Sequence, residues 1–383
     1  MPLITGSTRR FVFFPTTHPV HQLPNELKSH IISFCDMPTL VALLYDGQWR
    51  RFVETELMLT FLKTLSKVTA QPVAFRDMMR LTKAIITGST ALHYILRQPV
   101  EWQPSDLDLI VPLQSFEIAL SFIVKLPGAI VRFDSDDEAN NAYPGLRRGY
   151  TRMVQVQTTY GCIDVMQSSS RSPFNPLPSY WGTHVMNALT ADSFICPYPK
   201  LTYRHIALVK HRSQHPTITA VEHKYRSRGF TLYTSTRQFA NLSESCHDFS
   251  ACSGRDRYFG DYETLIVPIW DVDYRANDWA EPEAEFTTAW RLGGKACGNM
   301  CCFLPSRPAS STVRLLPGDC PETQRLSTSY YSMSAFHSIN TRFPPEPTTS
   351  LSPSTHPVIP DRSVYSTLSP PFLHSICHYS SSS

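Results

Sequence analysis

The first part of the chain carries apolar residues at intervals of three and four positions, the spacing of amphipathic helices. The positions that set this pattern are Leu27, Ile31, Ile32, Cys35, Leu40, Leu43 and Leu44. Pro24 suits the first turn of a helix, and the break Asp36-Met37-Pro38 separates this helix from the next one. Residues 49–52 lead into a third helix, so we predict a helical region over residues 21–65.

Residues 84–166 follow a different pattern, in which short apolar strands alternate with helices. AIITG and DLDLIVP are predicted strands, MVQVQTTYGCIDVMQ is a predicted hairpin turning at Thr158–Gly161, and TALHYIL and SFEIALSFIVKL have helical spacing. Residues 183–212 are expected to be helical apart from CPYP. YETLIVPIWDVD is expected to form an edge strand because it contains a proline. The pattern predicts an α+β fold.

Two aspartates interrupt the apolar pattern of one predicted strand. Strand side chains alternate between the two faces of a sheet. We therefore expect Leu107, Leu109 and Val111 to face the core, while Asp106 and Asp108 share the opposite face. Solvated acids at a strand edge are one explanation of this pattern. A cation held between the carboxylates is the other, because it offsets the cost of placing acids in a strand that is otherwise buried.

The predicted hairpin carries a third acid in a similar setting. Asp164 points away from the apolar face formed by Val154, Val156, Ile163 and Val165. If the hairpin pairs beside the strand with the two aspartates, three carboxylates converge, and they suit two divalent cations such as Mg²⁺ or Mn²⁺. Two such ions can activate an attacking hydroxyl and stabilise a leaving pyrophosphate.

The turn Gly88-Ser89 adds a candidate phosphate-binding element. Glycine allows close backbone approach, serine offers a hydroxyl, and the following helix offers free N–H groups. A strand, Gly-Ser, a helix, Asp-x-Asp and a later Asp on a neighbouring strand together resemble the nucleotidyltransferase superfamily of DNA polymerase beta. GSTAL…DLDL is similar in particular to the bacterial abortive-infection nucleotidyltransferase toxins. The similarity covers about residues 80–170, although the spacer TALHYILRQPVEWQPS is longer than usual for the family.

This resemblance implies a mixed sheet with flanking helices and a role for each motif residue. It implies that Gly88 and Ser89 hold a nucleoside triphosphate, and that Asp106 and Asp108 ligate both metal ions. It implies that Asp164 is the third metal ligand and the catalytic base, which helps to deprotonate an acceptor hydroxyl of unknown identity.

The helical segment LPNELKSHIISFCDMPTLVALLYDGQWRRF resembles an F-box. The resemblance implies that its helices dock on the linker subunit of cullin-type ubiquitin ligases. The matching positions are Leu23, Pro24, Leu27, Ile31, Ile32, Leu40, Leu43 and Trp49. Core packing of a small helix pair explains the same periodicity. A set of fungal proteins joins an F-box-like start to a nucleotidyltransferase-like body. With both resemblances, this chain is similar to that set.

The expected organisation is a leader (1–20), the F-box-like region (21–65), a nucleotidyltransferase-like domain (75–300) and a disordered tail (303–383) that is rich in Ser, Thr and Pro. Two functions follow from it. One is metal-dependent transfer of a nucleoside monophosphate from a nucleoside triphosphate to a hydroxyl. The alternative is a non-catalytic adaptor that recruits a ubiquitin ligase.

Composition adds limits on location and partners. The chain has 383 residues, a net charge of +3 and ten cysteines at irregular spacing. The weak positive charge does not by itself imply nucleic acid. No apolar stretch is as long as a membrane span, and the N-terminal segment is a poor signal peptide. We therefore expect an intracellular protein, cytoplasmic or nuclear, with reduced thiols.

Two further clusters have competing explanations. Lys210, Arg212, Lys224, Arg226 and Arg228 suit a triphosphate or an RNA backbone, although a solvated basic surface is favoured. A second cluster suits zinc by residue type, but it lacks the paired Cys-x-x-Cys spacing, so buried thiols are favoured. Its members are Cys246, His247, Cys252, Cys297, Cys301 and Cys302. His93 is expected to pack rather than to catalyse.

Overall fold

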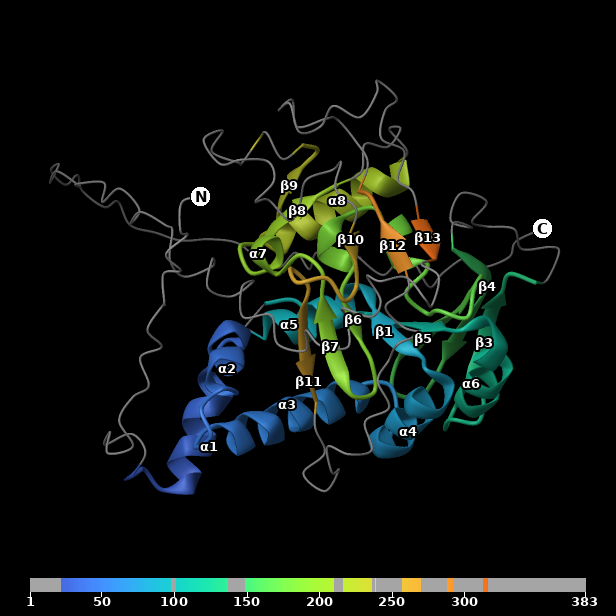
Figure 1. Ribbon diagram of the computed structural model, residues 1–383. Coiled ribbons are helices and arrows are strands. Elements are labelled where there is room, and N and C mark those ends of the chain that lie inside the picture. The colour runs from blue at the N-terminus through green and yellow to red at the C-terminus, as the bar shows by residue number, and fades with distance from the viewer. Residues whose placement is uncertain are drawn as a thin grey trace, which may run out of the picture. The chain divides into compact units, whose positions relative to one another are not determined.

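The fold is a mixed α+β arrangement built on an eight-stranded sheet with helices packed against it (Figure 1). A computed structural model describes residues 22–97, 101–136, 149–209, 216–235, 238, 257–269, 288–292 and 313–315. All of them belong to one compact unit. The expected leader and nearly all of the expected tail lie outside these residues.

The helices and strands have the following bounds. The helices are α1 (Asn25–Phe34), α2 (Met37–Leu43), α3 (Arg50–Leu65), α4 (Pro72–Thr82), α5 (Gly88–Leu96), α6 (Phe116–Ile123), α7 (Pro199–Thr202) and α8 (Pro216–Ser227). The main sheet has, in spatial order, β11 (Leu265–Pro268), β7 (Ser193–Cys196), β6 (Ala188–Leu189), β1 (Ile85–Thr87), β2 (Asp106–Val111), β5 (Cys162–Ser168), β4 (Tyr150–Gln157) and β3 (Ile130–Asp134). Two smaller sheets contain β10 (Arg257–Tyr258), β12 (Thr288–Trp290) and β13 (Val313–Leu315), and β8 (Ile206–Leu208) and β9 (Thr231–Tyr233).

The predicted elements around the acidic motif are confirmed. The strand before Gly88 is β1, the helix after it is α5, and the hairpin is β4 and β5, closed by a hydrogen bond from Thr158 N to Gly161 O. Strand β11, which contains Pro268, lies at an edge of the main sheet as expected. Strand β2 pairs parallel with β5, and the other pairs of the main sheet are antiparallel. The sheet is therefore mixed.

Two predictions of secondary structure were wrong. Residues 183–212 contain the strands β6, β7 and β8 and only a four-residue helix, α7. Thr190 closes a tight turn between β6 and β7, where its hydroxyl oxygen accepts hydrogen bonds from the backbone of Asp192 and Ser193. The periodicity of a short apolar segment cannot distinguish such a buried hairpin from a helix. Within the expected disordered tail, residues 313–315 form strand β13, which pairs with β12.

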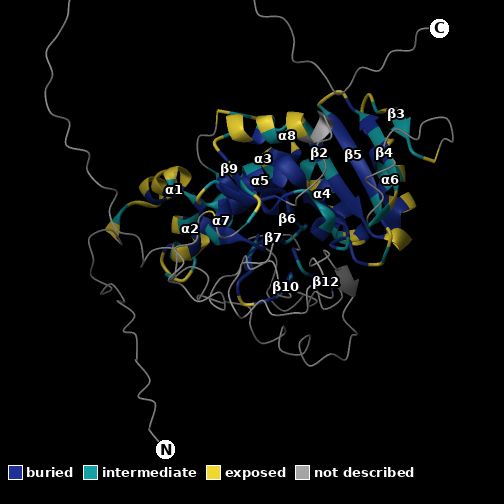
Figure 2. Ribbon diagram, turned by 90° about the horizontal axis from the view of Figure 1, so that it is seen from above, coloured by how far each residue is buried: buried dark blue, intermediate teal, exposed yellow. Residues whose placement is uncertain are grey.

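The two faces of the main sheet are covered by different elements. Leu107, Leu109 and Val111 of β2 belong to the core that includes α3, α4 and α6. Ile110 and Met166 belong to a second core, to which α7, β8 and β12 contribute. The central strands are accordingly buried, while α1 and α8 carry many exposed residues (Figure 2). The acids at positions 106 and 108 lie on the same face as Ile110 because strand side chains alternate.

The N-terminal helices share the core of the sheet rather than forming a core of their own. Ile32 of α1 and Phe61 of α3 are fully buried in the same apolar cluster as β2. Arg97, which follows α5, donates to the carbonyl oxygen of Cys35 at 3.0 Å and to Glu56 at 2.6 Å. The expected boundary between residues 65 and 75 therefore does not separate two hydrophobic cores.

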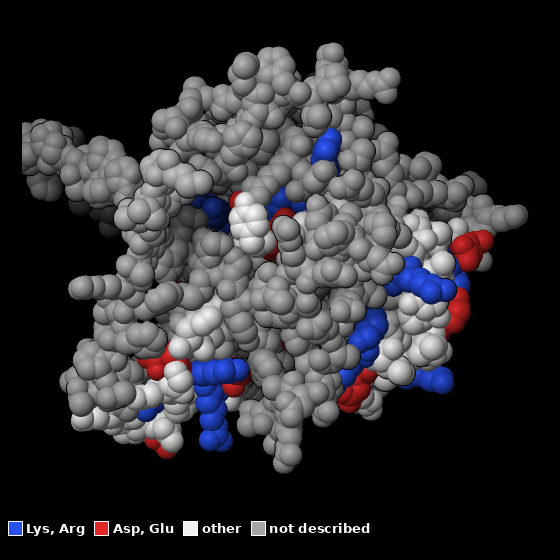
Figure 3. Space-filling view, viewed as in Figure 1, with Lys and Arg blue, Asp and Glu red and all other residues white. Residues whose placement is uncertain are grey.

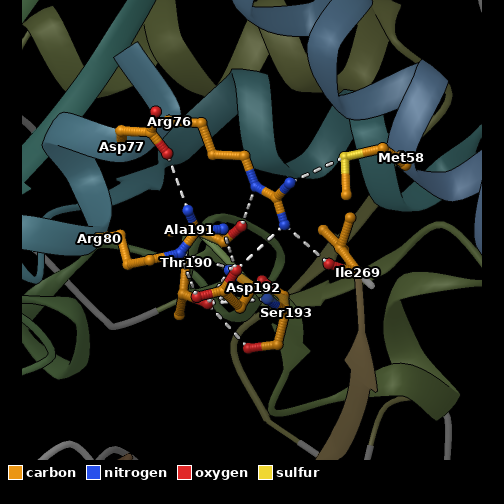
Figure 4. Close-up of polar contacts among 9 residues, drawn as sticks. All are labelled: Met58, Arg76, Asp77, Arg80, Thr190, Ala191, Asp192, Ser193 and Ile269. Atoms are coloured by element: carbon orange, nitrogen blue, oxygen red, sulfur yellow. Dashed lines mark hydrogen bonds and ion pairs between the residues drawn. The ribbon is translucent and has the colours of Figure 1, made fainter. Parts of the chain in front are cut away.

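A buried arginine fixes α4 to the edge of the sheet (Figure 4). Arg76 donates to Ala191 O at 2.7 Å, to Asp192 Oδ1 at 3.0 Å and to Ile269 O at 3.0 Å. Arg80 of the same helix also binds the Asp192 carboxylate, at 2.6 Å. These contacts satisfy backbone groups at the β6–β7 turn and at the end of β11, so the network supports the fold.

None of the helices in the described residues is long and apolar enough to cross a membrane.

Candidate functional site

The three acids predicted to converge lie on one face of two adjacent parallel strands. Asp108 of β2 is directly opposite Asp164 of β5 in the strand register. Asp106 lies two residues before Asp108 and so faces the same side. Asp106 and Asp108 are partly exposed, while Asp164 is 8% exposed. The pairing on which the prediction depended is therefore confirmed.

The first turn of α5 lies against these acids. Gly88 has a φ of +62°, and a Cβ added there would stand 2.0 Å from Asp108 Oδ2. Only glycine combines this left-handed backbone with such a close approach to the carboxylate. The hydroxyl of Thr90 donates to Asp106 O at 2.8 Å, which holds the start of β2 against the same turn. The Gly-Ser corner and the acidic face therefore form one structural unit.

Ser89 has a hydroxyl that is buried without a partner. The residue is 4% exposed, and its Oγ has no hydrogen-bond partner. A buried hydroxyl without a hydrogen bond costs free energy. A ligand oxygen at the start of α5 would satisfy it, and helix N-termini attract anions.

Burial and mutual repulsion act on the carboxylates. Burial raises the pKa of Asp108 well above its usual value, and the charges of Asp106 and Asp164 raise it further, while Lys224 opposes them. Burial raises the pKa of Asp164 to about 6. A hydrogen bond of 2.9 Å, which Gln155 Nε2 donates to Asp164 Oδ1, opposes that rise. The fold thus places negative charge where it is disfavoured, and a bound cation would relieve the cost.

The donor set fits a hard divalent cation, although the side chains are not gathered around one. As they lie, no three His, Cys, Asp or Glu side chains among the described residues are grouped so as to hold a metal ion. The backbones of β2 and β5 are nevertheless neighbours, about 4.8 Å apart as in any sheet. Rotation of the carboxylates can therefore bring their oxygens to a common point. Crowded carboxylate oxygens are the ligands that Mg²⁺ and Mn²⁺ prefer.

Two cations at the end of α8, one in the helix and one in the turn after it, complete the surroundings of the acids. Lys224 lowers the pKa of Asp108, and Asp106 is one of the charges that act on Arg228. Both cations are partly buried, whereas Arg226 is exposed. The favoured interpretation of the basic cluster as a solvated surface therefore holds for Arg226 and not for these two. This contact could not be predicted from a local pattern, because more than a hundred residues separate α8 from β2.

Several aromatic side chains near the site had no sequence signal either. Tyr180 lies close enough to Asp108 for that acid to raise its pKa, after the larger effect of burial. His184 is fully buried, and burial lowers its pKa to about 3. His93 packs edge-on against Trp102, with ring centres 5.2 Å apart, and burial lowers its pKa to about 4. The prediction that His93 packs is confirmed.

The eight positions that match an F-box divide into exposed and buried groups. Leu27 and Ile31 of α1 are 48% and 41% exposed, and Pro24 is also exposed. Leu23 and Leu43 are half-buried. Ile32, Leu40 and Trp49 are buried in the chain's own core. As placed, these three residues support the helices and do not offer a contact surface to a partner.

The other predicted residues lie outside the described part of the chain. They are Lys210, Arg212, Cys246, His247, Cys252, Cys297, Cys301 and Cys302.

Comparisons with protein-family models, with curated proteins and with solved structures found no match to this chain. The functional argument therefore rests on the geometry of the site.

Proposed function

We propose that this chain transfers a nucleoside monophosphate from a nucleoside triphosphate to an acceptor hydroxyl, with two Mg²⁺ or Mn²⁺ ions held by Asp106, Asp108 and Asp164. The observation that carries the proposal is the register that sets Asp108 opposite Asp164, beside the glycine that begins α5. The metal ions, when bound, supply charge stabilisation for the leaving pyrophosphate and acidify the attacking hydroxyl.

The side chains of the site have separate roles in binding the triphosphate and in accepting the proton. Gly88 leaves room for the Asp108 carboxylate beside the N-terminus of α5, and Ser89 donates its hydroxyl to a phosphate oxygen there. Asp164 accepts the proton of the acceptor hydroxyl. In the metal-free chain burial raises its pKa to about 6, so the carboxylate is ionised at neutral pH and can ligate a cation.

A label-transfer assay tests this function. The full chain is incubated with labelled nucleoside triphosphates, Mg²⁺ and total RNA or protein, beside the double variant Asp106→Asn plus Asp108→Asn. Transfer is expected from the wild type and from the control Asp136→Asn, whose side chain is exposed, but not from the double variant. Transfer that survives the double substitution would show that these acids are not the site.

A second candidate function, as an adaptor, is favoured by the apolar face of α1. Leu27, Ile31 and Phe34 are 48%, 41% and 77% exposed on one helix. Apolar side chains gathered on one helix face mark interaction sites more often than scattered ones do. The resemblance to an F-box suggests the linker subunit of a cullin-type ubiquitin ligase as the partner.

Binding to the purified linker subunit tests the adaptor. We expect the full chain to bind, and Leu27→Asp plus Ile31→Asp to abolish binding. Leu81→Asp is the control, because Leu81 is an exposed apolar residue on α4, at 73%. An intact chain that does not bind the subunit contradicts this candidate.

A further inference from the structure

A partly buried guanidinium near the acids has no carboxylate partner among the described residues. Arg228 Cζ lies 4.1 Å from the ring centre of Trp102 and 5.0 Å from that of Tyr225. Its Nη1 is buried and has no hydrogen-bond partner, and burial lowers its pKa. Among the described residues, no Asp or Glu lies within ion-pair distance of Arg228. Tyr225 hydrogen-bonds to the guanidinium and the charge of Asp106 acts on it, but neither reaches Nη1, so an anion bound at this nitrogen would satisfy a buried donor.

A second cation lies close by in the chain. Lys224 is in the last turn of α8, and Arg228 is in the turn that follows the helix, where its backbone N–H donates to Tyr225 O at 3.2 Å. Lys224 too has no ion pair among the residues that the structure describes. The two cations act on Asp108 and Asp106 respectively, so both stand near the acidic face.

Two more unpartnered groups in the same part of the fold are hydrogen-bond donors. Trp102 Nε1 is buried without a partner, as is the hydroxyl of Ser89. Indole and guanidinium groups can only donate. Unpaired donors and cations together would bind a negatively charged ligand that has many acceptor oxygens.

We propose that Arg228 and Lys224, with Trp102 holding the guanidinium plane, bind the polyphosphate of a nucleoside triphosphate. The proposal rests on the proposed function and names the residues that would receive its substrate. A planar guanidinium stacked on a ring keeps its N–H groups free for two oxygens of one phosphate. Trp102 lies between α5 and β2, so the segment that joins these two elements supplies the support.

A polyphosphate suits these residues better than an RNA backbone. An extended RNA track needs a basic stripe along the surface. Around the end of α8, Arg226 is exposed while Lys224 and Arg228 are partly buried, so these three residues do not form an open stripe. Figure 3 shows a different face of the molecule, on which described basic and acidic side chains are both present. A triphosphate needs only a compact set of donors, and it can place its other oxygens toward cations held by the acids.

Calorimetric titration of the full chain with inorganic tripolyphosphate, in metal-free buffer with EDTA, tests the proposal. Arg228→Gln is expected to weaken binding about tenfold or more, because charge-assisted hydrogen bonds to phosphate are lost. Arg228→Lys should have an intermediate effect, since it keeps the charge but not the fork. Arg226→Gln, at the exposed position two residues earlier, should change affinity less than about twofold. Asp106→Asn plus Asp108→Asn should bind more tightly, because two repelling charges are gone.

The outcomes separate this inference from the proposed function. Tripolyphosphate that does not bind, or that binds Arg228→Gln as tightly as the wild type, overturns the inference even if nucleotide transfer is observed. If tripolyphosphate binds as expected but no nucleoside triphosphate supports transfer, the proposed function is contradicted. The inference that these residues bind a polyphosphate is then still supported. If Arg228→Gln does not fold by circular dichroism, the comparison of wild type with Arg228→Lys decides.

Discussion

Replacing Asp164 by asparagine should stabilise the protein at neutral pH, although it removes a proposed catalytic group. Asparagine has the same shape and still accepts the hydrogen bond from Gln155. What it removes is a carboxylate that the fold disfavours. The pKa of Asp164 is about 6 in the folded chain, and that of an isolated aspartate is about 3.9. Because each pKa unit is worth about 1.4 kcal/mol, the charged carboxylate costs at most about 3 kcal/mol.

The pH dependence of stability is the reverse of that of an ordinary ion-paired aspartate, whose charged form stabilises the folded state. Above pH 6 the group is charged in both states, and the folded state bears the full penalty. As the pH falls from about 6 to about 4, the folded chain takes up the proton first and gains stability relative to the unfolded chain. Asp164→Asn should therefore be more stable than the wild type by up to about 3 kcal/mol at pH 7.5, with the difference vanishing near pH 4.

Urea unfolding at pH 7.5, 6 and 4.5 measures this difference. Asp134→Asn is the matched control, because Arg152 donates to the Asp134 carboxylate at 3.0 and 2.7 Å and so lowers its pKa. That variant should be less stable than the wild type at pH 7.5. The reasoning about charge crowding is refuted if Asp164→Asn is destabilised at pH 7.5, or if its effect does not change with pH.

Three further predictions follow from the geometry. Gly88→Ala should lower the free energy of unfolding by about 2 kcal/mol or more, because of its left-handed φ and the contact with Asp108, while Gly47→Ala, with no atom within 4 Å, should change it by less than about 1 kcal/mol. Arg76→Met should cost about 3 kcal/mol in the same assay, because it removes a buried charge that satisfies carbonyl groups, and a loss below about 1 kcal/mol would contradict the structural role of the network. Protons compete with metal ions for the Asp164 carboxylate, whose pKa burial raises in the metal-free chain, so the Mg²⁺ concentration needed for half-maximal transfer should rise as the pH falls from 7.5 to 5, and a Mg²⁺ requirement that does not change with pH would contradict its role as a ligand.

The acidic face could be predicted because its pattern is local. Alternation along a strand decides that Leu107 is buried and that its neighbours Asp106 and Asp108 are not on its face. The pairing of β2 with β5 brings two such local patterns together. The sequence did not predict this pairing itself; it predicted only that the three acids would converge if the two strands were neighbours. Once that pairing exists, the register alone brings Asp108 opposite Asp164.

Other parts of the site depend on contacts that no local pattern encodes. Lys224 and Arg228 look like solvated cations in the sequence, since a cluster of basic residues is typical of an exposed surface. In α1, Ile31 and Ile32 both suit an apolar stripe, yet Ile32 is buried and Ile31 is 41% exposed. Which of two adjacent apolar residues faces the core is decided by where the helix docks on the rest of the fold.

Anomalous diffraction from crystals grown with Mn²⁺ and a non-hydrolysable nucleoside triphosphate tests the central claim most directly. The account predicts two manganese peaks about 3.5–4 Å apart, in contact with Asp106, Asp108 and Asp164, with phosphate oxygens at the first turn of α5. Manganese peaks that lie elsewhere, or a triphosphate bound away from Gly88 and Ser89, would contradict it.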